Sequence, residues 1–130
     1  MARKKYSGEK RSRVATKLRK GDPVMVIAGG HKEKRKNKGQ VGKILRFTGA
    51  NLDRVVVEGV NVHVRHQRQL GPDKPAGKVK IEAGVHISNV MYYVEKAKKP
   101  VRLVHRELED GRKVRGYLDG KKKEFIQIDA

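Results

Sequence analysis

Short apolar stretches separated by turn-forming residues make up the hydrophobic pattern of this chain, and they predict strands rather than helices. Val24 to Ala28 is apolar at every position, which is typical of a strand covered on both sides in a small barrel. Gln40 to Phe47 and Arg54 to Glu58 predict two further strands, joined by the turn-forming residues Thr48 to Asp53. The last two strands therefore predict a hairpin with a projecting tip.

A period of two follows, which indicates strands with two different faces. Val60, Val62 and Val64 alternate with polar residues, so the valines would lie on one face and a polar, partly cationic row on the other. Lys78 to Val85 repeats the alternation and predicts a half-buried strand. Asn89 to Val94 is apolar enough to predict the strand that closes the barrel.

The C-terminal stretch predicts a small meander. Asp110-Gly111 and Asp119-Gly120 are tight-turn signals within Val101 to Ile128, and Lys96 to Pro100 predicts a loop before it. No segment has a helical period of convincing length, and no repeat of fixed length is present. The pattern as a whole predicts an all-β fold, with a small barrel and a β-rich C-terminal extension.

Composition divides the 130 residues into three parts. Residues 1–19 carry lysine and arginine at high density with almost nothing to bury, which predicts a basic flexible arm. Residues 20–70 are predicted to form the barrel core. The glycine- and proline-rich stretch Gly71 to Gly77 then opens residues 71–130, which would hold the barrel-completing strands and the meander.

The formal net charge of +19 predicts a polyanionic partner, since self-repulsion of this size is relieved by binding one. Residues 1–46 hold sixteen Lys and Arg against three acidic residues, whereas residues 107–130 hold six of each. A lipid surface is the rival to nucleic acid, but the chain has neither a spanning apolar run nor an amphipathic helix with a wide apolar face. Nucleic acid is therefore the predicted partner, bound mainly by the N-terminal third.

The densest charge run lies between the first two predicted strands. Its five cations cannot be buried, so they face either water or phosphate. A solvated loop is the plainer reading of any charge run, but this loop is fixed at both ends by strands, which favours a nucleic-acid contact. The glycines that begin the second strand would let two backbones, or a backbone and a ligand, approach closely.

The chain lacks the residue patterns that catalysis and cofactor binding require. It has no cysteine, which excludes disulfides, Cys-ligated zinc and thiol catalysis. His63 and His66 are three residues apart, so on a strand they point to opposite faces and do not form a metal pair. Gly42-Lys43 is followed by Ile44 and not by Ser or Thr, which breaks the phosphate-binding loop pattern. No carboxylate pair lies in an apolar setting, so no enzyme activity, cofactor or metal is predicted.

Aromatic residues are too few for a stacking platform. The chain has two phenylalanines, four tyrosines and no tryptophan. Tyr92 and Tyr93 are adjacent, so at most one of them could stack on a base. Cationic loops that read folded RNA through phosphates and sugars are the predicted mode of binding.

Four segments together resemble a known family. They are Lys-Gly-Asp-x-Val-x-Val-Ile-x-Gly from Lys20, Lys-Gly-x-x-Gly-Lys-Ile from Lys38, Val-Val-Val-Glu-Gly-Val-Asn-Val from Val55, and His-Ile-Ser-Asn-Val-Met from His86. Over about residues 19–117 the chain resembles the KOW-motif ribosomal protein family of the bacterial large subunit, number twenty-four in the usual count. Val-Glu-Gly-Val-Asn and His-Ile-Ser-Asn-Val are more specific than the KOW motif alone, which also occurs in transcription elongation factors.

The resemblance implies an SH3-like β-barrel bound to large-subunit (23S-type) ribosomal RNA near its 5′ end. It also implies an early role in subunit assembly and a place beside the exit of the peptide tunnel, in the cytoplasmic bacterial ribosome. Neighbouring large-subunit proteins and the nascent chain would be further partners, with no membrane. The alternative is a KOW-type RNA-binding transcription elongation or antitermination factor. A small nuclease is a remoter alternative.

The residues expected to act divide into three groups. The expected RNA-binding residues are Lys17, Arg19, Lys20, His31, Lys32, Lys34, Arg35, Lys36, Lys38, Lys43, Arg46, Arg65, His66 and Arg68. The expected structural glycines are Gly21, Gly29, Gly39, Gly42 and Gly59. The tip expected at the tunnel exit is Thr48, Gly49, Ala50, Asn51, Leu52 and Asp53. The loop before Gly39 departs from the family, because about four extra residues from Glu33 to Asn37 enlarge it.

Overall fold

The computed structural model describes residues 14–29, 36–74 and 76–128, and in these ranges it is built of strands with a single short 3-10 helix. The elements are β1 (Pro23–Val26), β2 (Val41–Thr48), β3 (Arg54–Val57), β4 (Val62–Gln67), β5 (Gly77–Glu82), β6 (Val85–His86), η1 (Ile87–Asn89), β7 (Val90–Val94), β8 (Lys99–Val101), β9 (Leu103–Glu107), β10 (Lys113–Leu118) and β11 (Phe125–Gln127). The predicted all-β class is confirmed.

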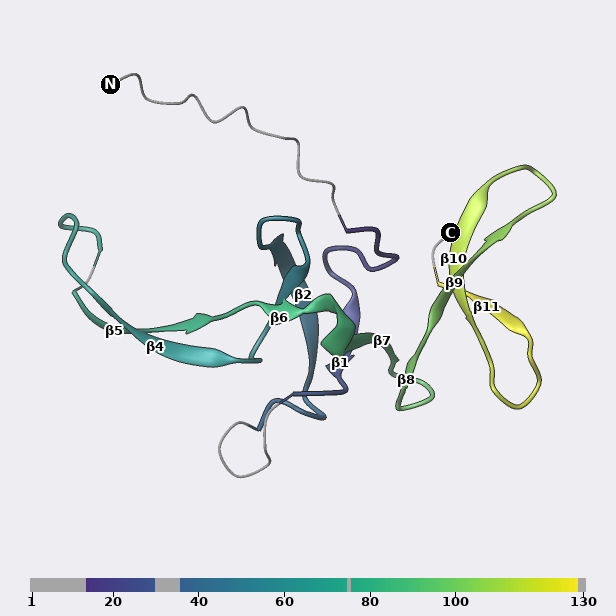
Figure 1. The fold of residues 1–130 in the computed structure, drawn as a ribbon, viewed down its shortest axis with the longest axis horizontal. Coiled ribbons are helices and arrows are strands. Elements are labelled where there is room, and N and C mark those ends of the chain that lie inside the picture. Colours follow the sequence, from purple (N-terminus) through teal and green to yellow (C-terminus); the bar gives the residue numbers. More distant parts are fainter. Residues whose placement is uncertain (1–13, 30–35, 75, 129–130) are drawn as a thin grey trace, which may run out of the picture.

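A six-stranded antiparallel sheet lies at the centre of the molecule (Figure 1), in the order β6-β3-β2-β1-β7-β8. Within it, β1 pairs with β2 on one side and with β7 on the other, so that Val24 lies between Gly42 and Tyr92. The buried core on this sheet is mostly valine, as suits a β-branched side chain on a pleated surface. It consists of Val24, Val26, Ile44, Val55, Val57, Val60 and Val90.

Burial along β1 alternates and is not uniform. Val24 and Val26 are buried, whereas Pro23 and Met25 are only half-buried. The continuous apolar run predicted a strand covered on both sides, and the structure shows this in part, because Pro23 and Met25 are covered less than Val24 and Val26. One face of β1 packs into the core, and the other is partly open because no second layer covers it completely.

The central sheet stays open. Its outer strands, β6 and β8, each pair with one neighbour only, and no pairing among the described strands joins them. They contain two and three residues, which leaves few backbone groups with which to close a ring. The predicted closed barrel is therefore not found. Lys99 and Pro100, which were expected in a loop, belong to β8.

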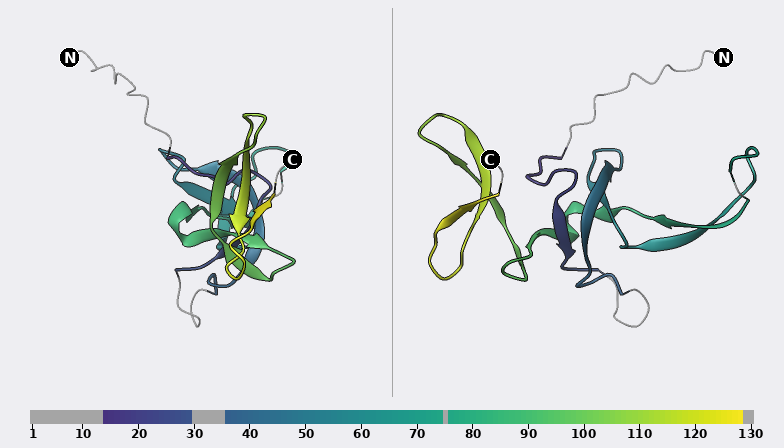
Figure 2. Two further views of the ribbon diagram at one scale, coloured as in Figure 1. Left: turned by 90° about the vertical axis from the view of Figure 1, so that its right-hand side faces the viewer. Right: turned by 180° about the vertical axis from the view of Figure 1, so that it is seen from behind.

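β4 and β5 form a separate two-stranded ribbon that extends away from the central sheet, as both Figure 1 and Figure 2 show. Val60 is buried just before the ribbon begins, but Val62 and Val64 are 44% and 55% exposed. The alternation of valines predicts a strand correctly. It does not predict a buried face here, because the ribbon leaves the sheet that would have covered it.

The predicted meander is confirmed. β9, β10 and β11 form a three-stranded antiparallel sheet in the order β11-β10-β9, on the opposite side of the central sheet from the ribbon (Figure 1). Turns lie at the two predicted Asp-Gly signals. Residues 71–74 form a tight turn at the far end of the ribbon, and the predicted boundary at residue 71 stays a prediction.

A buried ion pair joins the C-terminal sheet to the start of β1. The Arg115 guanidinium on β10 donates to both carboxylate oxygens of Asp22, at 2.6 and 3.1 Å, and Arg115 is 3% exposed. The same guanidinium donates to the backbone carbonyl of Lys17 at 2.7 Å. Asp22 in turn accepts from the Arg19 backbone N–H at 2.7 Å. Two segments distant in sequence, residues 17–22 and β10, are therefore fixed to one another through one carboxylate and one guanidinium.

Replacement of Asp22 by Ala leaves the buried Arg115 without its counter-ion, so we expect the free energy of unfolding to fall by about 3–5 kcal/mol. Urea titration of the whole chain measures the change. The matched control is Arg112→Ala, which removes a surface pair with Asp110 whose side chains are 80% and 69% exposed. That variant is expected to change stability by less than about 1 kcal/mol. Equal losses in the two variants would contradict the expectation that Arg115 is too buried to tolerate the loss of its counter-ion.

Gly42 occupies a position where two backbones cross closely. A Cβ there would clash with the Glu58 carbonyl oxygen and would lie 2.9 Å from Val57 Cγ1. Backbone atoms do not yield as a flexible side-chain end does, so β2 and the end of β3 can approach only over a glycine. The glycine at this position is required for space and not for an unusual dihedral angle.

Gly42→Val is expected to lower the free energy of unfolding by about 1–3 kcal/mol or more, because its branched side chain overfills the crossing. Thermal unfolding followed by circular dichroism checks this. Gly120→Val is the control, since nothing lies within 4 Å of a Cβ at that turn. A Gly42→Val protein with unaltered melting would show that the crossing can relax.

Candidate nucleic-acid interface

Backbone hydrogen bonds hold both ends of the β1-loop-β2 unit. Next to the loop, Gly39 N–H donates to the Val26 carbonyl at 2.8 Å, and Val26 N–H donates to the Gln40 carbonyl at 3.0 Å. At the other end, Gly21 N–H donates to the Ile44 carbonyl at 2.8 Å. Both ends of the loop are therefore fixed to paired strands.

The described part of the loop presents two cations to solvent. Lys36 and Lys38 are exposed within a turn that ends at Gly39, whose φ of +87° favours glycine. The other predicted residues of the loop, His31, Lys32, Lys34 and Arg35, lie outside the described residues.

A small amide cluster anchors the second half of this loop. Asn61 N–H donates to Asn37 Oδ1 at 3.3 Å, and Asn37 Nδ2 lies 3.5 Å from Asn61 Oδ1. His63 Nε2 lies 2.9 Å from the same Asn61 oxygen. Sequence analysis missed this cluster. The available signal was Asn61 itself, because asparagine tolerates the positive φ of 54° that it adopts here.

An irregularity in β2 turns Arg46 outward. Ile44 pairs with Val57 and Arg46 with Val56, so the register shifts between Ile44 and Arg46. Strict alternation would place Arg46 on the same face as the buried Ile44. The bulge instead leaves both Leu45 and Arg46 exposed, beside the exposed Lys43. Two predicted RNA-binding cations on β2 therefore face solvent, and the bulge brings Arg46 there.

The predicted cations of residues 17–20 are held in different ways. Lys17 Nζ donates to the Leu103 carbonyl at 3.2 Å, which leaves two further N–H groups of the ammonium. The Arg19 backbone is bound to Asp22, and the side chain of Lys20 is exposed. The C-terminal sheet therefore fixes the position of Lys17, a contact that sequence analysis did not foresee.

The two hairpins differ in how they are held. Asn51 in the predicted tip accepts from Val14 N–H at 3.0 Å, and the carbonyl of Asp53 accepts from Ile87 N–H at 2.9 Å. The tip from Thr48 to Asp53 is thus bound on two sides. Arg65, His66 and Arg68 are exposed on and beyond β4, in the ribbon that extends from the sheet. Of these two hairpins, the ribbon extends further from the central sheet (Figure 1).

Other kinds of site are not found in the part of the chain that the structure describes. No group of three or more His, Cys, Asp or Glu side chains is placed to hold a metal ion among these residues. None of the described helices is long and apolar enough to cross a membrane. The exposed cations described above, which are carried by paired strands and the loops beside them, make up the candidate interface.

Comparison with known proteins gives one consistent family. The family model described as large ribosomal subunit protein uL24, C-terminal domain, matches residues 60–118. The protein named large ribosomal subunit protein uL24 from Dehalococcoides mccartyi strain BAV1 is 46% identical over 99 residues, covering 76% of this chain and 89% of the relative. That of Geobacter metallireducens is 47% identical over 98 residues, covering 75% and 83%. That of Nitrosococcus oceani is 46% identical over 100 residues, covering 76% and 88%.

Replacing Lys34, Arg35, Lys36 and Lys38 together by Ala is expected to weaken RNA binding and to flatten its dependence on salt. The plot of log K against log salt has a negative slope, and each lost phosphate contact reduces the size of that slope by about 0.7–0.9. The loss of four contacts therefore reduces it by about 3. Filter binding to a large-subunit ribosomal RNA transcript at several salt concentrations measures the slope.

The control removes the same charge elsewhere. It replaces Arg112, Lys113, Lys121 and Lys122 by Ala, all exposed in the C-terminal sheet, and its slope is expected to change by less than half as much. Thermal unfolding of the loop variant should be nearly unchanged. A loop variant with the wild-type slope would identify the loop as solvated surface only.

Proposed function

Since the chain belongs to the family of large ribosomal subunit protein uL24, it is a non-enzymatic structural component of the large ribosomal subunit, and we propose that it binds 23S-type ribosomal RNA there. The family resemblance predicted from the four sequence segments is confirmed by these matches. The transcription-factor alternative is not supported, because the relatives reported above all carry ribosomal names.

The proposed binding element is an SH3-like KOW unit built on the central sheet. Family membership supports this assignment, together with the β1-loop-β2 unit and the close crossing at Gly42. In this proposal, the curved sheet fixes the directions of the exposed cations. Lys36, Lys38, Lys43 and Arg46 then meet phosphates of one folded RNA site.

The single observation that carries the RNA proposal is a set of exposed cations, carried by paired strands and the loop end beside them, in the more basic part of the chain. Sixteen Lys and Arg lie in residues 1–46, and those that the structure describes between Lys36 and Arg46 are all exposed. Phosphate neutralisation releases counterions and supplies affinity, whereas fixed positions restrict binding to a matching RNA shape. Flexible cations alone would supply the first effect without the second.

The proposal also covers the place of the protein in the cytoplasmic ribosome. The protein would bind near the 5′ end of the RNA early in assembly, and it would lie beside the tunnel exit. Neighbouring ribosomal proteins and the nascent chain would then be partners. Sequence analysis assigned the tunnel contact to the tip from Thr48 to Asp53. The geometry favours the β4-β5 ribbon for that contact, since the tip is bound to Val14 and Ile87 whereas the ribbon extends from the sheet.

Sedimentation with crosslinking tests the proposal. Full-length protein should co-migrate almost completely with large subunits in a sucrose gradient at moderate salt. In subunits carrying a stalled nascent chain, a photo-crosslinker at Gln69 of the ribbon should reach that chain, and one at Asn51 should not. Recovery with RNA polymerase would defeat the ribosomal assignment, and crosslinks from Asn51 alone would return the tunnel contact to the tip.

A further inference from the structure

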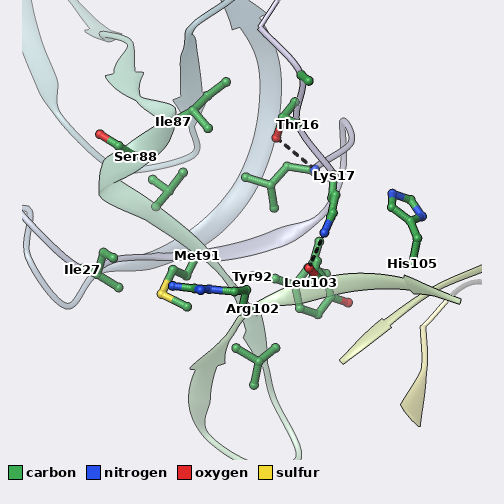
Figure 3. A pocket seen from close by; sticks show the side chains of 14 residues that line it. Thr16, Lys17, Ile27, Ile87, Ser88, Met91, Tyr92, Arg102, Leu103 and His105 are labelled. Atoms are coloured by element: carbon green, nitrogen blue, oxygen red, sulfur yellow. Dashed lines mark hydrogen bonds between the residues drawn. The ribbon is translucent and has the colours of Figure 1, made fainter. Parts of the chain in front are cut away.

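A groove of about 640 Å³ lies at the junction of the two larger sheets. Residues 15–18 form one wall, η1 and β7 form another, and the link from β8 to β9 forms the third (Figure 3). Its lining is mainly aliphatic and aromatic, with Ile27, Ile87, Met91 and Tyr92 among the residues that Figure 3 labels. A volume of this size is within the range of small-molecule sites, about 300–1,000 Å³.

The polar residues that line the groove are cationic or neutral. Lys17, Arg102 and His105 line it, and none of the described residues that line it is acidic. Arg102 is exposed in the single-residue link between β8 and β9, and it lines the same groove as Met91. The Lys17 ammonium is fixed over the groove by its bond to the Leu103 carbonyl. An apolar floor with a cationic edge suits a ligand that has both a flat apolar face and negative charge.

The walls of the groove are held in place by the junction described above. Arg115 donates to the carbonyl of Lys17, which lines one wall, and β10 pairs with β9, which follows the link that carries Arg102. β7 is paired on both sides, with β1 and with β8. The cationic edge and the apolar floor are therefore attached to one rigid body, and the groove does not have to form when a ligand arrives.

We propose that this groove binds a single unpaired nucleotide of large-subunit ribosomal RNA, with its base against Met91 and Tyr92 and its phosphate at Arg102 and Lys17. The inference rests on the proposed function and adds a base-binding site to it. Unpaired bases of folded RNA stack on aromatic rings and on guanidinium planes, and thioethers also make favourable contacts with aromatic rings. Arginine suits phosphate because its planar fork donates two parallel hydrogen bonds.

A peptide with apolar and acidic side chains is the competing occupant. The nucleotide is favoured because the groove adjoins a basic segment of the N-terminal third, where Lys17, Arg19 and Lys20 lie within four residues. RNA bound along that segment would bring its phosphates to the edge of the groove. The lining supplies one tyrosine ring, that of Tyr92, because Tyr93 does not line the groove, so the site takes a single stacked base.

Ultraviolet crosslinking of the full chain to a large-subunit ribosomal RNA transcript, followed by mass spectrometry, tests the site. The expected result is a nucleotide attached at Met91 or Tyr92, within the tryptic peptide of residues 81–96. Arg102→Ala should lower the yield of this adduct at least about fivefold, in line with the loss of one stacked and charge-bound base. Overall RNA affinity should fall by less than about tenfold, since one contact among many is removed.

Lys121→Ala is the matched control. It removes one exposed cation from the turn between β10 and β11, away from the groove, and should change the adduct yield less than twofold. Because Arg102 is exposed, its replacement is expected to leave thermal unfolding unchanged, so a lower yield would not reflect misfolding. Arg102→Glu should lower the adduct yield further than Arg102→Ala, since it places a negative charge beside the phosphate.

Each outcome is decisive for one of the two proposals. RNA binding with adducts only elsewhere, for example at residues 36–46, would overturn the groove site and leave the proposed function intact. An adduct yield that Arg102→Ala does not lower would also overturn it. Crosslinks from Met91 to a neighbouring protein in intact subunits would assign the groove to a peptide instead. Failure of the chain to bind the transcript at all would overturn the proposed function itself.

Discussion

The buried pair of Asp22 and Arg115 is the contact on which the arrangement of this protein depends. The central sheet and the C-terminal sheet also meet in a small apolar cluster of Val94, Val101 and Tyr117, but apolar contacts are non-directional and do not by themselves specify how one sheet is placed on the other. A bidentate carboxylate–guanidinium pair is directional, and here it also takes in the backbone of Lys17 and Arg19. Desolvation of both charges is costly, so the pair is better understood as fixing a geometry than as adding much net stability.

Sequence reasoning succeeded where local chemistry decides the structure. The strands from Val41 to Thr48 and from Arg54 to Val57, and the two Asp-Gly turns of the meander, follow from β propensity and turn residues. The space requirement at Gly42 was also visible, since a glycine at the start of a strand marks a close approach. These features need only a few neighbouring residues to be specified.

The features that sequence reasoning missed all depend on contacts between distant residues. Nothing in the segment around Asp22 indicates that residue 115 supplies its counter-ion. The same holds for the amide cluster of Asn37 and Asn61 and for the bulge that turns Arg46 outward. Both depend on how strands pair, and the register of that pairing cannot be seen in the sequence alone. For Val62 and Val64 the strand was predicted correctly but the burial was not. A period of two indicates that a strand has two different faces, and it does not indicate whether another layer covers one of them.

The ribbon of β4 and β5 has a thermodynamic consequence for the free protein. An isolated two-stranded hairpin is marginally stable in water, and this one has exposed valines where a covering layer would otherwise lie. Opening the ribbon exposes little additional apolar surface, so it forms a local folding unit of low stability beside a far more protected sheet.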